Sequence, residues 1–390
     1  MNSNSPTLDH RLNLARRLTT EVLGPLKSSF VGKDEIIDLL GICLVGGENL
    51  FILGPPGTAK SAIVHELARR IEGQVFDYLL TRFTEPSEIF GPFDIRKLRD
   101  GELITNTEGM LPEASVAFLD ELLNANSAIL NSLLMALNER VFRRGRETRP
   151  LPLLMVVGAS NRLPEDDALA ALFDRFLLRV RSDNVADDRL GDVLLAGWQL
   201  DLSDRRRPHG ALSVDQLRQV QSILPEIDLT NVRAQYVDLV RRLRRAGITV
   251  SDRRAVKLQR LVAASSVLCG RLVANGTDLW VLRNIWDRDE QQEVIAAIVQ
   301  EFVNKAEEEE FRTAHPRARG DLPQPDDLAR ELNRIRSALE TTGTPDADRE
   351  MLRDQLSLLA GRCAWVADAQ QRRFLEQKVQ ETWALSRETP

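Results

Sequence analysis

Apolar residues in the first half of the chain alternate between short continuous runs and helical repeats. The runs at residues 51–53, 76–80, 116–119 and 153–159 are typical of buried strands. Between them, apolar positions recur at i, i+3, i+4 and i+7, most clearly in the helix predicted over 127–137. The alternation continues to about residue 182, which predicts a mostly parallel sheet with helices on both faces.

The pattern changes after about residue 185, where every apolar repeat is helical and the breaks fall at Ser213, Pro225, Gly247 and Gly276. Amphipathic helices are also predicted over 8–28 and 34–45. A Pro- and Gly-containing linker at 317–326 precedes three further helices, over 327–341, 346–361 and to about 386. We therefore expect an α/β domain at 1–184, an all-α domain at 185–312 and a linker with a C-terminal helical segment at 313–390. The last helices could form a small bundle or dock a partner.

Two hairpins interrupt the alternation. Extended runs at 94–99 and 102–107 flank Asp100-Gly101, a strong turn signal, within an insertion near 84–109. A second, shorter hairpin is expected over 141–149, before the strand at 153–159. Either hairpin could simply be a surface feature.

The segment from Asn49 to Ala62 carries the strongest chemical signal. A buried strand is followed by a glycine-rich turn and by Lys60-Ser61 at the start of a helix, which is the arrangement of a phosphate cradle. Its glycines let backbone N–H groups face bound oxygens, Lys60 supplies a positive charge to β- and γ-phosphates, and Ser61 supplies a hydroxyl to Mg²⁺. Ala59 stands where the strict pattern has glycine. The alternative is an ordinary strand–turn–helix with a surface lysine. The predicted nucleotide-contacting residues are Gly54, Pro55, Pro56, Gly57, Thr58, Ala59, Lys60, Ser61 and Ala62.

Polar residues end two later strands. Asp120 and Glu121 follow an apolar run, and an acidic residue at a strand tip beside a phosphate loop holds Mg²⁺. Glu121 could then polarise the attacking water. Asn161 ends the strand at 153–159 and could orient that water, although asparagine at a strand end can also be a turn former. The predicted metal ligands are thus Ser61 and Asp120.

The length, net charge and cysteine content of the chain argue against some classes of function. The chain has 390 residues, which suggests two or three domains, and a net charge of −6, which disfavours a protein that coats nucleic acid. We interpret the basic clusters at 205–207 and 241–245 as solvated surface. The alternative is that they pair with the acidic residues 307–310 across a subunit interface. No run is long enough to span a membrane, no signal peptide is evident, and three dispersed cysteines suggest reduced thiols. We expect a cytoplasmic protein.

The order of these motifs resembles the MoxR group of AAA+ ATPases, and most closely its RavA-like branch. The resemblance rests on the phosphate loop, residues 119–121, 158–161, 172–176 and 250–254, and covers roughly residues 15–300. Segments 86–92 and 159–164 favour the branch. It implies a P-loop AAA+ core, an all-helical lid, ATP/ADP with Mg²⁺ as cofactors, and a homo-oligomer, normally a hexameric ring in which the hairpin near 84–109 faces the central pore.

The resemblance also implies further site residues. Val31, in the turn before the helix at 34–45, would contact the adenine. Arg175 resembles the arginine finger that reaches a neighbour's γ-phosphate, although it could instead be a surface arginine paired with Asp174. Ser251 is a good N-cap, and an arginine in the following turn opposes the helix dipole, which favours an anion-binding duty. We place the family's second sensor arginine at Arg253, with Arg254 as the alternative.

Three functions remain open on this basis. The first is a MoxR-type chaperone that remodels protein clients by ATP hydrolysis, with a partner bearing a von Willebrand factor A domain. The second is a helicase-like motor that depends on nucleic acid, since related hairpin-bearing proteins include helicase subunits. The third is a scaffold that binds nucleotide without turnover, which the intact Asp120-Glu121 pair argues against. The acidic charge balance favours the first.

Overall fold

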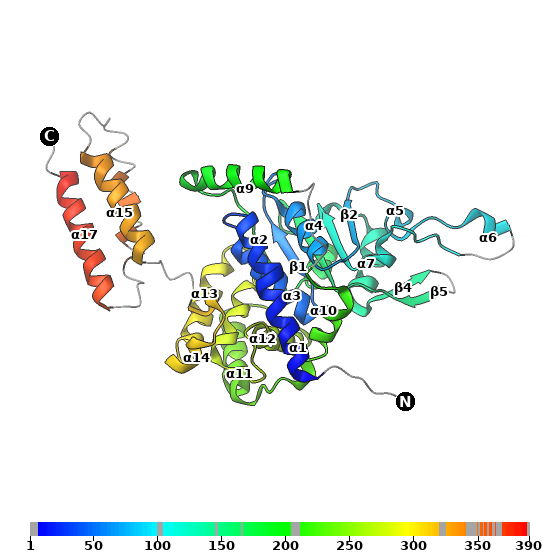
Figure 1. The fold of residues 1–390 in the computed structure, drawn as a ribbon. Coiled ribbons are helices and arrows are strands. Elements are labelled where there is room, and N and C mark those ends of the chain that lie inside the picture. Colours follow the sequence, from blue (N-terminus) through cyan, green and yellow to red (C-terminus); the bar gives the residue numbers. More distant parts are fainter. Residues whose placement is uncertain are drawn as a thin grey trace. The chain divides into compact units, whose positions relative to one another are not determined.

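The computed structural model describes residues 7–99, 104–144, 147–164, 167–203, 211–319, 325–340 and 369–387, with positions 349, 352–353, 355–356, 359–360 and 363. The chain forms two compact units, Met1–Ala318 and Arg319–Pro390 (Figure 1). The first unit holds both the α/β core and the helical lid.

The core is built on a five-stranded sheet with the order β2-β3-β6-β1-β7. All four pairings are parallel, as expected. Because parallel strands share one direction, their carboxyl ends meet at one edge of the sheet and their amino ends at the other. The strands are β1 Leu50–Leu53, β2 Val75–Leu79, β3 Val116–Asp120, β6 Met155–Ser160 and β7 Leu178–Arg181.

Helices cover the sheet through the apolar faces that the sequence pattern predicted. In α7, Asn126 is the N-cap, and its side chain accepts hydrogen bonds from the N–H groups of Ala128 and Ile129. The face of α7 that carries Leu133 and Leu137 is buried. The core helices are α3 Asp34–Gly46, α4 Lys60–Arg70, α5 Pro86–Phe90, α7 Ser127–Glu139 and α8 Asp167–Phe173, with the short 3₁₀ turns η2 Leu111–Glu113 and η3 Leu122–Asn124.

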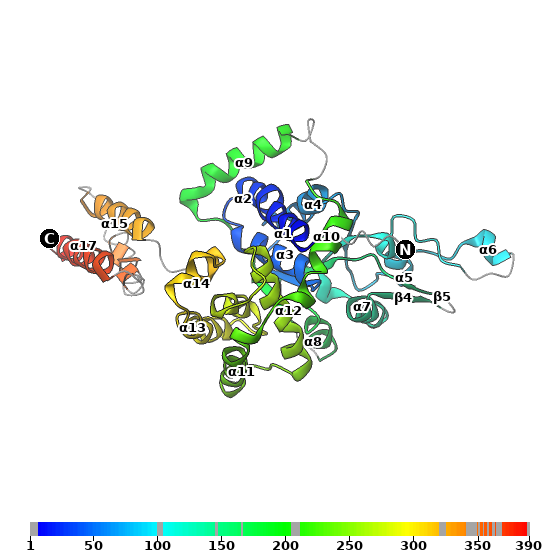
Figure 2. The same cartoon turned by 60° about the horizontal axis from the view of Figure 1, so that its bottom comes forward.

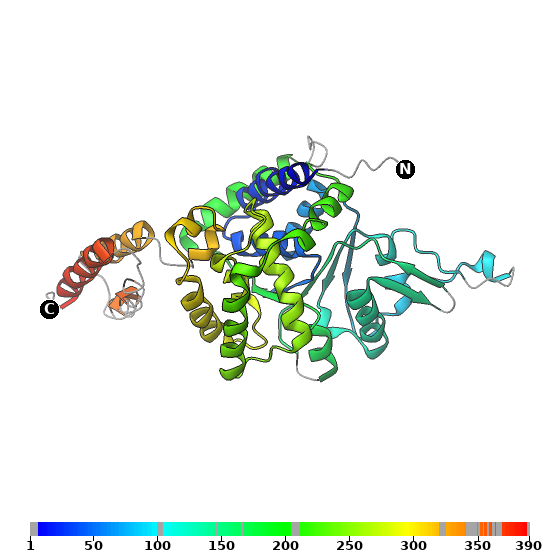
Figure 3. The same cartoon turned by 90° about the horizontal axis from the view of Figure 1, so that it is seen from below.

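The N-terminal segment is helical from α1 Leu8–Arg17 through the π-helical η1 Leu18–Leu23 to α2 Gly24–Ser29. It ties the core to the lid. Arg11 forms an ion pair of 2.7 Å with Glu226, and the Arg17 guanidinium donates to the Ala211 carbonyl at 2.6 Å. Figures 2 and 3 show α1 lying along the lid helices.

The lid is helical, as expected. Ser213 forms a capping box with Gln216 at the start of α10, and the Ser251 hydroxyl accepts from the Arg254 N–H at the start of α12. An isolated bridge joins Asp228 to Val273. The elements are η4 Asp187–Arg189, α9 Leu190–Ser203, α10 Val214–Gln221, η6 Leu224–Glu226, α11 Thr230–Arg245, α12 Asp252–Leu268, η7 Gly276–Asn284, α13 Gln291–Val303, α14 Glu308–Arg312 and η8 Pro316–Arg319.

The two predicted hairpins have different outcomes. The shorter one is confirmed, because β4 Val141–Arg144 pairs antiparallel with β5 Glu147–Pro150. In the longer one, Phe93 pairs antiparallel with Thr105. The extended run predicted over 94–99 is wrong, however, because Ile95–Arg99 forms the helix α6.

The Asp94 side chain explains this helix. Its carboxylate accepts from the N–H groups of Arg96 and Lys97, which is how an aspartate starts a helical turn. Figure 3 shows α6 projecting away from the sheet. The predicted turn at Asp100-Gly101 and the basic cluster at 205–207 lie outside the described residues.

The C-terminal unit contains α15 Pro325–Glu340 and α17 Ala369–Arg387. It has an apolar core of its own, which favours the bundle alternative for these helices. The helix predicted over 346–361 falls largely outside the described residues. This core is formed by Leu328, Leu332, Ile335, Leu339, Leu356, Leu359, Cys363, Leu375 and Val379. Among the described helices of the whole chain, none is both long and apolar enough to cross a membrane.

Candidate functional site

Three of the predicted motifs meet at the carboxyl edge of the sheet. The Gly54 N–H donates to the Ser160 carbonyl at 2.9 Å, so the glycine loop starts beside the end of β6. β6 lies between β3 and β1 in the sheet. Asn161 therefore lies between the acidic pair at the end of β3 and the loop after β1, as the sequence predicted.

The loop after β1 has the backbone form of an anion site. Gly57 has φ +83°, and no atom lies within 4 Å of the position that a side chain would occupy. At Gly54 a Cβ atom would lie 2.2 Å from the Ser182 carbonyl oxygen, so only glycine fits there. The N-cap of α4, Ala59, makes no side-chain hydrogen bond to the helix. The first N–H groups of α4 are thus available to phosphate oxygens.

Lys60 lies inside this loop. Its side chain is buried, with 6% exposed, and its ammonium donates to the carbonyls of Gly54 at 2.9 Å and Pro55 at 2.8 Å. The Thr58 hydroxyl also donates to the Pro55 carbonyl at 3.0 Å. The loop therefore holds a positive charge beside the open N–H groups of α4, which fits a polyphosphate.

Ala59 is strained. It has φ +64°, in the left-handed region that favours glycine, at the position where the strict motif has glycine. The structure shows that the departure affects the backbone, because the loop keeps the left-handed turn without the residue that adopts it most easily.

The acidic pair is also held in an unusual backbone. Glu121 has φ +49°, and its N–H donates to the Asp120 carboxylate at 2.9 Å. Burial raises the pKa of the Glu121 carboxyl, and the neighbouring Asp120 raises it further, whereas Lys60 and Arg162 lower it. The charges of the loop and of the acidic pair therefore act on one another. A carboxylate with a raised pKa is suited to accept a proton near neutral pH.

The turn that contains Val31 lies against the start of the lid. Gly32 has φ +73°, and a Cβ atom there would lie 3.1 Å from a methyl group of Val185. Next to it, the buried Lys33 ammonium donates to the Ser182 hydroxyl at 3.3 Å, and that hydroxyl donates to the Thr58 carbonyl at 3.2 Å. This chain of contacts connects the Val31 turn to the glycine loop.

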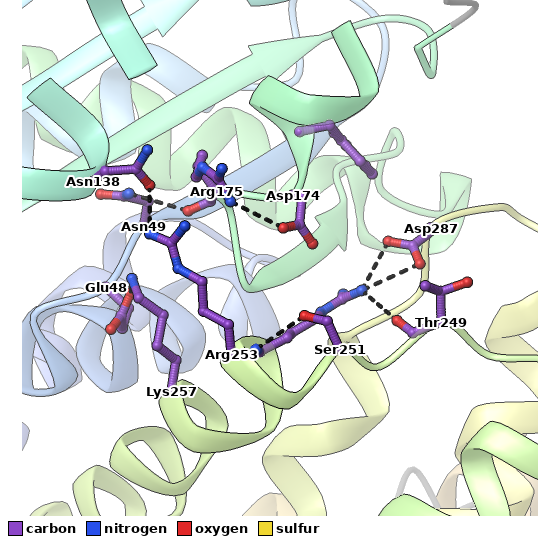
Figure 4. Close-up of polar contacts among 12 residues, drawn as sticks. Glu48, Asn49, Asn138, Asp174, Arg175, Thr249, Ser251, Arg253, Lys257 and Asp287 are labelled. Carbon is purple, nitrogen blue, oxygen red and sulfur yellow. Dashed lines mark hydrogen bonds and ion pairs between the residues drawn. The ribbon is translucent and has the colours of Figure 1, made fainter. Parts of the chain in front are cut away.

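Arg175 lies at the opposite, amino edge of the sheet. Asn49 immediately precedes β1, and its side-chain amide donates to the Arg175 carbonyl at 3.2 Å (Figure 4). The Arg175 guanidinium pairs with Asp174 at 3.1 Å, the contact expected of the surface-arginine alternative. Its Nε is buried, however, and finds no acceptor among the described residues. The Arg175 side chain is 22% exposed, and a guanidinium has five N–H donors, so donors other than the buried Nε remain for another acceptor.

Arg253 joins Arg175 at this amino edge. Its guanidinium donates to the Asn138 side-chain carbonyl at 3.1 Å, at the end of α7 (Figure 4). Arg253 is exposed and pairs with no carboxylate among the described residues. Its neighbour Lys257 pairs with Glu48 at 3.0 Å. A small pocket here is lined by Asp174, Arg175, Leu177, Arg253, Arg254 and Lys257.

Arg254 points the other way and is a structural residue. Its side chain is 3% exposed, and its guanidinium bonds to the Asp287 carboxylate at 3.1 Å and to the Thr249 carbonyl at 3.1 Å. Arg179, which is fully buried on β7, pairs with the same carboxylate at 3.0 Å. Burial raises the pKa of the Asp287 carboxyl, and Arg254 opposes that rise. Of the two arginines considered from the sequence, only Arg253 is free to meet a ligand.

The chain is similar in sequence to known protein families. Residues 16–222 match the family described as the MoxR domain in the MoxR-vWA-beta-propeller ternary systems, and residues 227–299 match an AAA lid domain. An uncharacterized protein from Methanocaldococcus jannaschii is 36% identical over 286 residues, which cover 73% of this chain and 74% of the relative. The chain belongs to the MoxR family of AAA+ ATPases.

The chain is also similar to two other proteins. The chaperone MoxR1 of Mycobacterium tuberculosis is 27% identical over 159 residues, covering 40% of this chain and 41% of that protein. A Cytophaga hutchinsonii protein described as a proposed ATPase has a solved structure that covers 77% of this chain and 97% of its own, with a TM-score of 0.62 at 18% identity. That likeness shows the fold, so the P-loop AAA+ core with a helical lid is confirmed.

Several polar residues at the two edges of the sheet in this MoxR protein were not predicted from the sequence. Lys33 stands behind the loop, and Arg162 follows Asn161 and donates to the Asn124 side chain at 3.1 Å. At the amino edge, Asn49 and Asn138 hold the backbone of Arg175 and the side chain of Arg253. No motif marks these asparagines, because each acts through a contact with a distant segment. Arg162 had a local signal, since it is next to Asn161.

Proposed function

We propose that this MoxR protein hydrolyses ATP, with Mg²⁺, at sites that are completed by the neighbouring copy in a homo-oligomeric ring. The glycine loop and the Val31 turn bind the nucleotide, and Lys60 faces its β- and γ-phosphates. Ser61 and Asp120 would hold Mg²⁺, which neutralises charge on the phosphates when it is bound. The loop's open N–H groups and buried ammonium support this assignment.

The chemistry falls to two residues of the same chain. Glu121 takes a proton from the attacking water, and its raised pKa suits that role. Asn161, between the acidic pair and the loop, orients the water. The scaffold alternative, in which nucleotide binds without turnover, gives no reason for a carboxylate held at φ +49° beside the loop.

One observation carries the proposal that sites are shared between copies. Arg175 and Arg253 lie together at the amino edge of the sheet, whereas the loop lies at the carboxyl edge. The four residues of β1 alone span about 13 Å at the usual rise per residue, more than an arginine side chain can bridge. The arginines therefore serve the loop of a second copy, which meets this face head to tail. Such contacts close into a ring, and the resemblance favours six members.

The wider biological role follows the family. The matched family description names a system of MoxR, vWA and β-propeller proteins, and MoxR1 carries the name chaperone. These names support a remodeller of protein clients that acts with a von Willebrand factor A domain partner. We propose that it acts in the cytoplasm. We place the chain in the RavA-like branch on segments 86–92 and 159–164. The projecting segment around α6 would then face the pore.

A mixing experiment tests the shared site. Arg175→Ala and Arg253→Ala chains keep a sound loop but lose a neighbour's arginine, whereas Lys60→Ala chains keep both arginines but lose the loop. Each arginine variant alone should hydrolyse ATP ~10³-fold more slowly, the usual worth of an arginine finger. Each should regain turnover when mixed with an excess of Lys60→Ala chains, because a sound loop then meets sound arginines.

The matched control is the double variant Lys60→Ala with Arg175→Ala, and likewise Lys60→Ala with Arg253→Ala. Neither should restore turnover to its corresponding single arginine variant, since every neighbour lacks the needed arginine. Ring size is measured on the same samples. Rings that form and bind nucleotide yet regain no activity would refute the shared site.

A further inference from the structure

Helix α9 presents its large apolar side chains to solvent. The exposed fractions are 66% for Leu194, 60% for Leu195 and 67% for Trp198. Leu190, Leu194, Trp198 and Leu202 follow one another at intervals of four residues, so they form a single ridge along the helix. Contiguous exposed apolar surface of this kind marks an interaction site. We call these four residues the α9 ridge.

The position of α9 connects the ridge to the nucleotide loop. Helix α9 packs on α2. Its Leu200 lines a pocket together with Ala62 and His65 of α4, the helix that follows the glycine loop. A surface therefore runs from α4 onto α9. Figures 1 and 2 show α9 on the side of the first unit opposite α11, which belongs to the lid.

The lid carries complementary charge and apolar surface. Asp187 and Asp192 are exposed beside and on α9, whereas the last turn of α11 carries the exposed Arg245. Its neighbours Arg242 and Arg244 pair with Glu301 and Asp252 of the same chain. Val256 of α12 is 65% exposed, one turn after Arg253. A head-to-tail contact that brings Arg253 to a neighbour's loop would bring an apolar and basic surface toward an apolar and acidic one.

We propose that the α9 ridge docks on the lid of a second copy of this chain, against the exposed faces of α11 and α12. The inference rests on the proposed shared site and extends it, because it names a surface that holds the ring together away from the nucleotide. The copy that offers its loop also offers its α9 ridge, and the copy that offers Arg175 and Arg253 also offers Val256.

Photo-crosslinking identifies the occupant. A photoreactive phenylalanine analogue replaces Leu194 in the full chain that carries Glu121→Gln, which is mixed with isotope-labelled chains lacking the analogue and assembled with ATP. We expect crosslinks between copies, to peptides within residues 230–260. Crosslinks to α9 of the second copy, to residues 319–390, or none in rings that have formed, would overturn the proposal.

Paired variants measure the contribution of the ridge. Leu194→Glu with Trp198→Glu should weaken assembly ~100-fold or more, given the usual worth of two buried large apolar side chains. Gln199→Glu is the matched control, since it adds a carboxylate to an exposed position of the same helix and should change assembly less than ~3-fold. Sedimentation across a concentration series gives the dissociation constants. Thermal unfolding and nucleotide binding by the separated chains show that the variants are folded.

The two proposals can fail separately. Unchanged assembly of the Leu194→Glu, Trp198→Glu chain, together with regained turnover in the arginine mixtures, would remove the α9 contact and leave the shared site. Crosslinks to residues 230–260 without regained turnover would support the α9 contact and remove the shared site. A wild-type chain that never assembles would overturn both.

Discussion

The two edges of the central sheet are built in different ways. At the carboxyl edge, the loop after β1, the acidic pair after β3 and Asn161 after β6 converge within one chain. At the amino edge, Arg175 and Arg253 gather beside asparagines. One edge has the backbone donors of a phosphate site, and the other has guanidinium groups with unused hydrogen-bonding capacity.

The two halves of the site are also held by different means. The loop edge is fixed by short-range backbone geometry, with Gly57 and Ala59 in left-handed conformations. The arginine edge is fixed by contacts between distant segments. Arg254 of the lid and Arg179 of β7 share Asp287, and this buried group holds the start of α12 against the core.

The largest expected effect separates the edges by nucleotide binding. Lys60→Ala should lower the affinity for Mg·ATP by ~10² or more, because charged hydrogen bonds to the phosphates are lost. Arg175→Ala should bind like wild type in separated chains. Calorimetric titration of both variants measures this. An equal loss of Mg·ATP affinity in the two variants would show that nucleotide binding is not confined to the carboxyl edge.

The next effect divides binding from chemistry within the loop edge. Glu121→Gln removes the proton acceptor and keeps Asp120, so turnover should fall by ~10² while ATP stays bound. In wild type, turnover should decline as the pH falls through the raised pKa of Glu121, because the protonated acid cannot accept a proton. Steady-state rates from pH 5 to 8 measure both. A variant with wild-type turnover would place the base elsewhere.

A third effect compares two adjacent arginines at the amino edge. Arg254→Met should destabilise the fold by roughly 3 kcal/mol, because it removes a buried partner of Asp287 and leaves carbonyl groups without a donor. Arg253→Met should change stability by less than ~0.5 kcal/mol, since its side chain is exposed. Urea unfolding gives both values. Similar losses would mean that Arg253 is structural as well.

The smallest effect concerns strain in the loop. Ala59→Gly should stabilise the chain by ~0.5–1 kcal/mol, because glycine adopts the left-handed backbone without the penalty paid by alanine, and the gain is reduced by the added freedom of the unfolded chain. Gly197→Ala, within α9, is the reference for an exposed helix position. Thermal unfolding of both variants measures the change in stability. A loss of stability on Ala59→Gly would show that the methyl group packs favourably.

Features that depend on neighbouring residues could be predicted from the sequence. The strand before Gly54, the turn chemistry of the loop and the cap at Ser251 are each encoded within a few neighbouring residues, so they could be predicted. The parallel order also followed, because alternating strands and helices allow few topologies. The extended run at 94–99 failed because a single Asp94 side chain starts a helix there.

The arrangement of the amino edge depends on packing between distant segments. Arg253 and Arg254 are neighbours in sequence with the same charge, and nothing local says which one is buried. Asp287, Thr249 and Arg179 come from separate segments, and their packing takes Arg254 into the interior and leaves Arg253 beside Arg175. The outward ridge of α9 also depends on the fold, because a repeat of apolar residues predicts a buried face until the structure shows which side the rest of the chain covers.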